Sequence, residues 1–306
     1  MDTKWIILIL FSLIANYMYH EYKQCEDNFE SHEHYKLVSE YFLDKGTQKK
    51  PILWIHTSTE INARNWESFY SRNNKKLNQP YLQMTMKSIY DHCKDSFNVC
   101  LINDAAFSSL LSWNIDLDDL ADPIKSHYRQ LGLSMLLYHY GGVVVPQSFL
   151  CTQDLKPLAR ECFFVTEMIN RGITHDQRDY FPDITFMGCK KKNETMKRLV
   201  DYQEELYKDK TAQSDFIGNV SLWLQRQKVT VIDGSWIGIK KVDGKPVALA
   251  EVLGTSDLEL PPHYGVYLSQ EEILTRPKYS WFARMSTDQI LESPFYFSKK
   301  VRSVWK

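Results

Sequence analysis

The chain has 306 residues, of which 43% are apolar, and its 37 Lys and Arg against 38 Asp and Glu leave a formal net charge of -1. A near-neutral chain has no global field that draws it to nucleic acid, so a basic nucleic-acid-binding protein is excluded. The 18 Tyr, 15 Phe and 8 Trp supply ample apolar surface to bury, which excludes a disordered or collagen-like chain. The length fits one large domain or two small ones.

The six cysteines are spread along the chain without a C-x-x-C pair, so their spacing excludes a zinc ribbon and a thioredoxin-like redox site. We expect most of them to be buried as small apolar residues. A disulfide between Cys93 and Cys100 is an alternative in an oxidising compartment, because it would close a short loop between a predicted helix and a predicted strand. The cysteines are Cys25, Cys93, Cys100, Cys151, Cys162 and Cys189.

Residues 5–19 (WIILILFSLIANYMY) are apolar except for one Ser and one Asn. This segment is short for a spanning helix, which needs about 20 apolar residues, but its Trp and Tyr residues are typical interfacial anchors. It lacks the small-residue pattern of a signal-peptide cleavage site, so we favour an uncleaved, single-pass anchor over residues 1–22, with a cleaved signal peptide as the alternative. Residues 23–50 are polar and are interpreted as a stem before a globular domain over residues 51–306.

The side of the membrane on which the globular domain lies stays open. Lys4 before the apolar segment is nearly matched by Lys23 after it, so the flanking charges specify no orientation. Two Asn-x-Ser/Thr sequences, at Asn193 and Asn219, are compatible with a lumenal or extracellular domain, but such sequences also occur by chance.

Three short apolar runs indicate buried strands over residues 51–57 (PILWIHT), 97–102 (FNVCLI) and 143–145 (VVV). None of them alternates between apolar and polar residues, so we expect three neighbouring central strands. Between them, apolar residues at three- and four-residue spacing predict helices over residues 78–93 and 105–111.

The longest helical pattern covers residues 124–140, and we expect Ile124, Tyr128, Leu131 and Met135 on its core face. Gly141 and Gly142 follow this helix and end it, because glycine adopts a left-handed C-cap without steric penalty.

Further along the chain, strands are predicted over residues 162–166 and 184–187, and a helix over residues 194–208. A strand over residues 229–232 and an Asp-Gly turn at residues 243–244 indicate an antiparallel lobe. The alternation of strands and helices predicts an α/β fold with a mixed, mostly parallel sheet flanked by helices.

Ligands of such folds bind beyond the carboxyl ends of the parallel strands. Polar side chains follow each of the first three predicted strands, and the topology is expected to bring them together. These clusters form the default site: His56 and Thr57, then Asn103 and Asp104, then Pro146, Gln147 and Ser148.

Several familiar signatures are missing from the chain, namely G-x-x-x-x-G-K-[ST], G-x-G-x-x-G, H-E-x-x-H and G-x-S-x-G. Their absence weakens the cases for a phosphate-loop kinase, a dinucleotide dehydrogenase, a zinc protease and a serine hydrolase. A lumenal hydrolase would need an acid/base pair that the sequence does not place.

The informative pattern is a strand PILWIHT, a helix containing Ser88-Ile89, a strand ending at Asn103-Asp104, and a long helix ending in LYHYGG at residues 137–142. This layout, from residue 51 to about 158 and weakly to 206, resembles the glycosyltransferases with a DXD sugar-binding region and the related capsular-polysaccharide synthesis proteins. It resembles more loosely the uncharacterised membrane-anchored homologues of large DNA viruses. The resemblance implies a GT-A-like fold and a nucleotide-sugar donor. Its donor-binding candidates are His56, Thr57, Asp104, Lys125, Arg129, Gln130, Gly141, Gly142 and Gln147.

The chain departs from this family where the family binds its metal. After Gly-Gly the family has a strand of the type I-Y-L-D-x-D, whose carboxylates hold a divalent cation, whereas this chain continues VVVPQS without a carboxylate. The family's Ser-Asp falls on Arg129 and Gln130, and its Arg falls on Leu133. Because Mg²⁺ and Mn²⁺ need anionic oxygen ligands, we expect no metal and no other cofactor here. A literal D-x-D does occur at Asp116 and Asp118, before the long helix.

Acidic residues before a helix are favoured by the helix dipole, so we interpret Asp116 and Asp118 as structural. The helix of seventeen residues is about 25 Å long, and we therefore expect these carboxylates to lie far from Gln147. Asp104 has two interpretations, a ligand contact or the N-cap of the following helix.

Without a metal, the charge of a diphosphate must be balanced by other groups. Arg129 suits bidentate phosphate contacts, and Lys125 lies one turn earlier on the same predicted helix. The alternative is that both side chains only solvate the outer face of this helix.

Two functions remain. The first is a membrane-anchored glycosyltransferase-like protein that transfers a sugar from a nucleotide sugar to a glycan or protein acceptor without a metal. The second is a non-catalytic glycan-binding or structural membrane protein derived from the same fold. In both cases the expected partner is a membrane, through residues 5–19, and not nucleic acid.

Overall fold

The computed structural model divides the chain into two compact units, Met1–Phe42 and Leu43–Lys306. All described residues belong to the second unit. The predicted anchor over residues 1–22 and the predicted stem up to residue 49 lie outside them. In the part of the chain that the structure describes, no helix is both long and apolar enough to cross a membrane. The described residues are 50–57, 79–111, 113, 115–169, 180–208 and 216–305.

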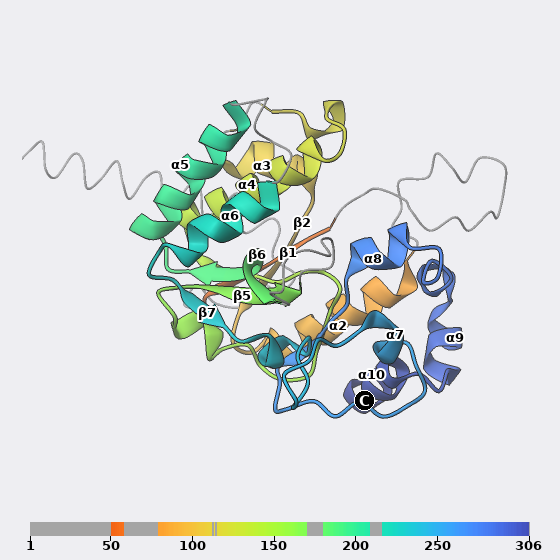
Figure 1. The fold of residues 1–306 in the computed structure, drawn as a ribbon. Helices are drawn as coiled ribbons and strands as arrows, with labels where there is room; N and C mark the ends of the chain where they lie inside the picture. The colour runs from red at the N-terminus through yellow and green to blue at the C-terminus, as the bar shows by residue number, and fades with distance from the viewer. Residues whose placement is uncertain are drawn as a thin grey trace, which may run out of the picture. The chain divides into compact units, whose positions relative to one another are not determined.

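A mixed sheet of six strands forms the centre of the second unit (Figure 1). β1 is parallel to β2 and to β3, and β5 is parallel to β7. β6 runs antiparallel to both of its neighbours, β3 and β5. Three of the five strand pairs are therefore parallel, so the sheet is mixed and mostly parallel, as expected. The strands are, in sheet order, β2 (Asn98–Ile102), β1 (Ile52–His56), β3 (Gly142–Val144), β6 (Tyr180–Cys189), β5 (Phe163–Ile169) and β7 (Thr230–Ile232).

The three strands expected to be neighbours are neighbours, but only β1 and β3 are central, because β2 lies at the edge of the sheet. The prediction for β2 was wrong because a continuous apolar run indicates only that both faces of a strand are covered. It does not indicate that the strand has a neighbouring strand on each side. β7 also differs from the expectation. It lies at the other edge, parallel to β5, and not in a separate antiparallel lobe.

A second, smaller sheet is antiparallel and pairs β4 (Phe149–Cys151) with β8 (Gly265–Tyr267). The predicted turn at residues 243–244 lies in a short hairpin closed by a bridge between Lys240 and Pro246. The carboxy-terminal half of the chain therefore does contain antiparallel pairs, in this hairpin and between β8 and β4. Residues 229–232 do not take part in them.

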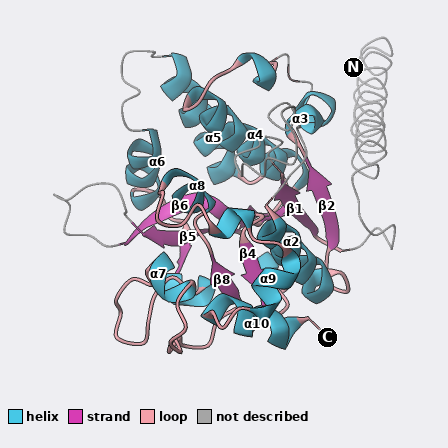
Figure 2. Cartoon of the chain, turned by 90° about the vertical axis from the view of Figure 1, so that its right-hand side faces the viewer, coloured by secondary structure: helices cyan, strands magenta, loops and turns pink. Residues whose placement is uncertain are grey.

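Helices cover both faces of the central sheet (Figures 1 and 2). One face carries α3, α4, α5 and α6, and the other carries α2, whose Ile89 and Cys93 pack against the sheet. Residues of α2, α7, α8, α9 and α10 form a second apolar core with the small sheet, and this core includes Tyr81, Phe282 and Phe297. The helices are α2 (Pro80–Cys93), α3 (Asp104–Leu111), α4 (Ile124–Tyr140), α5 (Glu194–Lys208), α6 (Phe216–Gln225), α7 (Leu249–Val252), α8 (Gln270–Thr275), α9 (Thr287–Glu292) and α10 (Tyr296–Val304). Short 3₁₀ turns cover Leu117–Asp119, Leu158–Arg160, Gly234–Ile237 and Phe282–Arg284.

Helix α4 has the predicted bounds, but its buried face differs from the expected one. Only Leu131 of the four expected core residues is buried, and Ile124 is 43% exposed. The reason is close packing against α3. A Cβ atom at Gly132 would lie 2.7 Å from the Trp113 ring and 2.9 Å from the Phe107 ring. Small residues therefore face inwards in the middle of α4. The spacing of the large apolar residues does not predict this contact between α4 and its neighbours.

Cys93, Cys100, Cys151 and Cys189 are buried free thiols, as expected for most of the cysteines, and Cys162 is exposed. Cys93 and Cys100 are not joined in the structure, so the alternative of a disulfide between them does not hold there. Cys25 lies outside the described residues.

Two glycines allow α4 to be followed at once by the central strand β3. The Trp54 indole N–H donates a hydrogen bond of 2.9 Å to the carbonyl oxygen of Gly141. Gly142 has a φ of 109°, and a Cβ atom there would lie 2.2 Å from the carbonyl oxygen of Ile52. The contact between β1 and β3 at this end of the sheet therefore depends on the absence of a side chain at Gly142.

Candidate functional site

A cavity of about 830 Å³ opens beyond the carboxyl ends of β1 and β3, where the sequence placed the default site. Its walls come from β1, α4, the turn between β3 and β4, β6 and the carboxy-terminal region. The polar and charged residues that line it are His56, Asp122, Ser126, Arg129, Gln130, Gln147, Ser148, Thr185, Tyr267, Gln270, Glu271, Thr275, Ser280 and Arg284.

Four of the predicted donor-binding residues line this cavity: His56, Arg129, Gln130 and Gln147. Asp104 is not among the lining residues but bonds to two of them. The structure thus brings together side chains from β1, α3, α4 and the turn after β3, as the topology argument predicted.

The remaining predicted residues lie elsewhere. The Thr57 hydroxyl donates to the carbonyl oxygen of Ile102 at 3.1 Å, and Thr57 does not line the cavity. Gly141 and Gly142 lie at the amino-terminal start of β3, at the opposite end of the strand from the cavity, where they pack against backbone atoms. Their placement favours a structural role over a direct contact with a ligand in this cavity.

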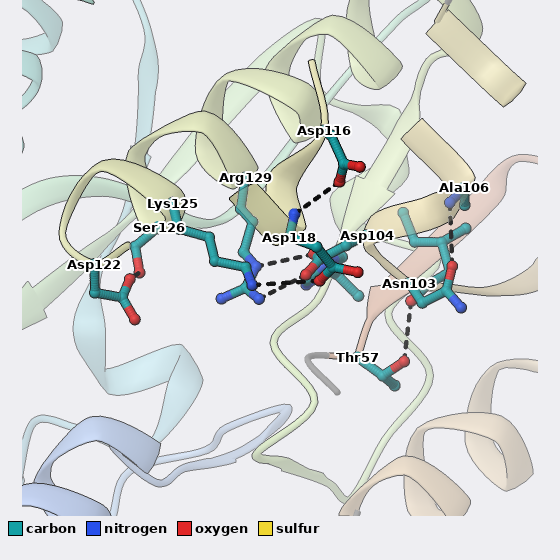
Figure 3. A network of polar contacts seen from close by, with 12 residues as sticks. Thr57, Asn103, Asp104, Ala106, Asp116, Asp118, Asp122, Lys125, Ser126 and Arg129 are labelled. Carbon is teal, nitrogen blue, oxygen red and sulfur yellow. Dashed lines mark hydrogen bonds and ion pairs between the residues drawn. The ribbon is translucent and has the colours of Figure 1, made fainter. Parts of the chain in front are cut away.

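Asp104 is the centre of a buried polar network (Figure 3). Its Oδ1 accepts from Arg129 Nε at 2.9 Å, its Oδ2 accepts from Arg129 Nη2 at 2.6 Å, and Oδ1 lies 2.8 Å from His56 Nε2. The three side chains are only 10% to 11% exposed. Burial alone would raise the pKa of Asp104, but the hydrogen bonds and charges of His56 and Arg129 outweigh it and hold this pKa well below its usual range.

The N-cap interpretation of Asp104 is wrong. Asn103 Oδ1 accepts a hydrogen bond of 3.1 Å from the backbone N–H of Ala106, so Asn103 caps α3 and Asp104 is the first helical residue. The carboxylate of Asp104 is thereby left to His56 and Arg129.

Lys125 and Arg129 do not solvate the outer face of α4. The Lys125 side chain is 10% exposed and its Nζ lies 3.6 Å from Asp118 Oδ1, while Arg129 is held by Asp104 (Figure 3). Both cations that the sequence offered for a diphosphate therefore have carboxylate partners within the protein.

The length of α4 does not separate the start of this helix from Gln147. β3 runs back along α4, so the start of α4 and the end of β3 meet at the same cavity, which both Asp122 and Gln147 line. Asp116 and Asp118 are not among the lining residues. Asp116 caps the 3₁₀ turn by accepting from the N–H of Asp118, which is the structural role expected for it.

Gln147 lies in the turn that follows β3 and lines the cavity. Helix α2 fixes this turn, because the Thr85 hydroxyl donates to the carbonyl oxygen of Gln147 at 2.5 Å. The Gln147 side chain donates from Nε2 to Gln270 Oε1 at 2.8 Å, and its buried Oε1 accepts no hydrogen bond from any described residue. The carboxyl end of β3 is therefore held between α2 and α8.

The lining residues do not fit a divalent cation. Within the described ranges, no group of three or more His, Cys, Asp or Glu side chains comes together in a way that could hold a metal ion. The carboxylates of the cavity, Asp122 and Glu271, come from separate elements, and an amide occupies the end of β3. No step is therefore assigned to a metal.

Several lining residues escaped the sequence argument. Gln270 and Glu271 on α8 and Arg284 in the last 3₁₀ turn belong to the carboxy-terminal region, which carries no motif with a chemical role. Gln147 and Gln270 are 123 residues apart in sequence, so no local pattern could join them. Ser126 is an exception, because it lies about one turn before Arg129 on the helix that the sequence did identify, and Asp122 lies just before that helix.

The sequence matches no protein-family model, and no curated protein matches it. Solved structures similar to the chain include three glycosyltransferases. The apo form of GlyE from Streptococcus pneumoniae TIGR4 is 11% identical over 84% of this chain and 63% of that chain, with a TM-score of 0.37. The PaToxG glycosyltransferase is 11% identical over 67% of this chain and 78% of that chain, with a TM-score of 0.35. The galactosyltransferase LgtC with donor and acceptor sugar analogues is 13% identical over 83% of this chain and 96% of that chain, with a TM-score of 0.39.

TM-scores this low do not establish a shared fold, so the function of this chain is inferred below from its own residues. The chain spans 63% of the length of GlyE. These similarities lend no support to the looser resemblance to proteins of large DNA viruses.

Proposed function

We propose that this chain is a glycosyltransferase-like protein that binds a nucleotide sugar in the cavity beyond β1 and β3. The observation that carries the proposal is the position and lining of this cavity, at the carboxyl ends of parallel strands and rich in amides, hydroxyls and carboxylates. Its volume of about 830 Å³ suits a ligand of this size. The carboxylates of Asp122 and Glu271 and the amide of Gln130 are groups that hydrogen-bond sugar hydroxyls.

The phosphates of such a donor need a cation to balance their charge. Arg129 and Lys125 are each paired with a carboxylate of the protein, so we looked for another cation in the cavity. Arg284 lines the same cavity, is exposed and has no ion-pair partner among the described residues. A guanidinium binds phosphate oxygens in a bidentate manner. Arg284 is therefore the phosphate-binding residue of this proposal, and Arg129 shapes the wall.

Binding of a nucleotide sugar is expected to be independent of metal. Calorimetric titration of the protein with a panel of nucleotide sugars should give the same Kd in Mn²⁺ and in EDTA. Arg284→Gln should raise this Kd about tenfold or more, since it removes a charge-assisted hydrogen bond. Lys278→Gln is the matched control, because Lys278 is an exposed cation six positions earlier that does not line the cavity, and its Kd should not change. Binding that requires Mn²⁺, or no binding to any donor, would contradict the proposal.

A second function, non-catalytic glycan binding, is favoured by one specific observation. Both cations near the strand ends are already paired with carboxylates, and the end of β3 carries an amide. The polar groups at these strand ends suit a neutral, hydroxyl-rich ligand, whereas a diphosphate would depend on Arg284. Binding of free oligosaccharides, with no binding of any nucleotide sugar, would select this function.

Membrane anchoring through residues 1–22 is part of the proposal and rests on the apolar run over residues 5–19 alone. The full-length protein is expected to stay in the membrane fraction after alkaline carbonate extraction and to be released only by detergent. A variant that lacks residues 1–22 is expected to leave the membrane fraction and to keep the melting temperature of the globular domain. Extraction of the full-length protein by carbonate, or a mature chain that begins after Tyr19, would contradict this prediction.

A further inference from the structure

His56 lies at the carboxyl end of β1, where it lines the cavity and contacts the carboxylate of Asp104. Its Nε2 is 2.8 Å from Asp104 Oδ1. Asp104 also accepts two hydrogen bonds from Arg129, which keep its carboxylate in place and ionised. A histidine oriented by a carboxylate and open to a cavity has the geometry of an enzyme's acid/base group.

The contact with Asp104 determines which ring nitrogen of His56 carries the proton. The surroundings hold the pKa of Asp104 well below its usual range, so near neutral pH this carboxylate is ionised and can only accept hydrogen bonds. His56 Nε2 must therefore be the donor. In the neutral ring, the lone pair is then on Nδ1.

Nδ1 is the nitrogen that can reach a ligand. It has no hydrogen-bond partner in the described part of the chain, and it is not one of the buried polar atoms that lack a partner. The ring is also fixed from the side, because Phe107 stacks on it with 5.4 Å between ring centroids and 19° between ring planes. His56 thus presents a basic nitrogen to the cavity in one orientation.

We infer that His56 is a catalytic base, whose Nδ1 removes the proton from the acceptor hydroxyl as that hydroxyl attacks the sugar. This inference rests on the proposed function. In the step, the acceptor oxygen forms a bond to the anomeric carbon, and the bond from that carbon to the leaving phosphate oxygen breaks. The electron pair of the broken bond leaves with the nucleoside diphosphate. The hydroxyl proton moves to Nδ1, and the imidazolium that forms keeps its hydrogen bond to Asp104.

The charged groups around the ring determine the expected pH dependence. Transfer requires neutral His56, so its rate should rise with pH along an acid limb. The charged groups that touch the ring or its partner, or line the same cavity, are Asp104, Asp122, Arg129, Glu271 and Arg284.

The test compares wild type with His56→Gln, whose side-chain amide can keep the hydrogen bond to Asp104 but has no basic nitrogen. With a nucleotide sugar that the wild type binds and a panel of hydroxyl acceptors, the single-turnover transfer rate should fall by about 10² to 10⁴ and lose its acid limb. The Kd for the nucleotide sugar and the melting temperature should stay the same. An unchanged rate, or a loss of donor affinity that accounts for the whole loss of rate, would overturn the inference.

A measurement without substrate separates this inference from the proposed function. In ¹⁵N NMR spectra of the wild type, the His56 ring should be protonated at Nε2 and not at Nδ1 when it is neutral. The opposite tautomer would overturn the catalytic base even if nucleotide sugars bind. The expected tautomer in a protein that binds no nucleotide sugar would instead mean that the proposed function is wrong while the arrangement of the ring is right.

Discussion

Replacing Gly142 with alanine is expected to lower the free energy of unfolding by about 3–5 kcal/mol, the sum of a backbone and an overpacking penalty. Its φ of 109° is a conformation that residues with a side chain rarely adopt. The new Cβ atom would also lie 2.2 Å from the carbonyl oxygen of Ile52, so β1 and β3 would have to move apart. Urea denaturation of the wild type and the variant measures this loss.

Gly244→Ala is the matched control for this substitution. Gly244 also has a positive φ, of 79°, but nothing lies within 4 Å of the Cβ atom that the substitution would add. The loss there should be limited to the backbone penalty of about 1 kcal/mol. Equal losses at the two positions would show that the contact with Ile52 does not limit the packing of β1 against β3.

Gly142 also illustrates what the sequence could and could not predict. The pair Gly141-Gly142 correctly marked the end of α4, because glycine at a helix end is a local signal. The family resemblance then made both glycines donor-binding candidates. A direct contact with a ligand in the cavity needs a position beside it, whereas Gly142 begins β3 and the strand reaches the cavity only at its carboxyl end, before Gln147.

Local patterns predicted the elements well. The bounds of α4 and α5 and the positions of β1, β2 and β3 follow from apolar spacing within each segment. The buried face of α4 did not follow, because it depends on the Trp113 and Phe107 rings, which press against Gly132 from outside the helix. The spacing of apolar residues within a helix contains no information about which residues pack against that helix.

The candidate site was predictable in part for the same reason. His56, Asp104 and Gln147 could be expected together because parallel strands end at one edge of a sheet. The length of α4 was no guide to the position of Asp122, because β3 returns along α4 and ends at the same cavity, whereas Asp116 and Asp118 do not line it. No sequence pattern indicated that Glu271 and Arg284 line the cavity, because they reach it only through the packing of the carboxy-terminal region.

Replacing Arg129 with alanine is expected to destabilise the protein by about 3–5 kcal/mol, because it leaves the carboxylate of Asp104 buried without its main partner. Both side chains are only 10% to 11% exposed, and the pair is joined by two hydrogen bonds. Lys197→Ala removes a cation from an exposed pair with Asp201, where water screens the charges, so its loss of stability should be far smaller. Urea denaturation at pH 7 compares the two variants.

This interpretation differs from a role of Arg129 in binding phosphate, and a double variant separates the two. Asp104→Asn with Arg129→Met removes both charges, so its loss of stability should be smaller than the sum of the two single losses. If Arg129 acts mainly on a ligand, the single and double variants should be about as stable as the wild type and should both lose binding. Additive losses of stability would contradict the buried pair.

The pH dependence of the Arg129→Ala variant follows from the direction of the Asp104 pKa. The pKa of Asp104 is lowered in the folded state, so its pairing stabilises the protein above the ordinary carboxyl pKa of about 4. That contribution is lost as the pH falls below this value and the carboxylate takes up a proton. The stability difference between wild type and Arg129→Ala should therefore be largest near pH 7 and shrink steadily below about pH 4. A difference that stays constant or grows with acidification would show that Arg129 stabilises the fold through packing and not through the charge of Asp104.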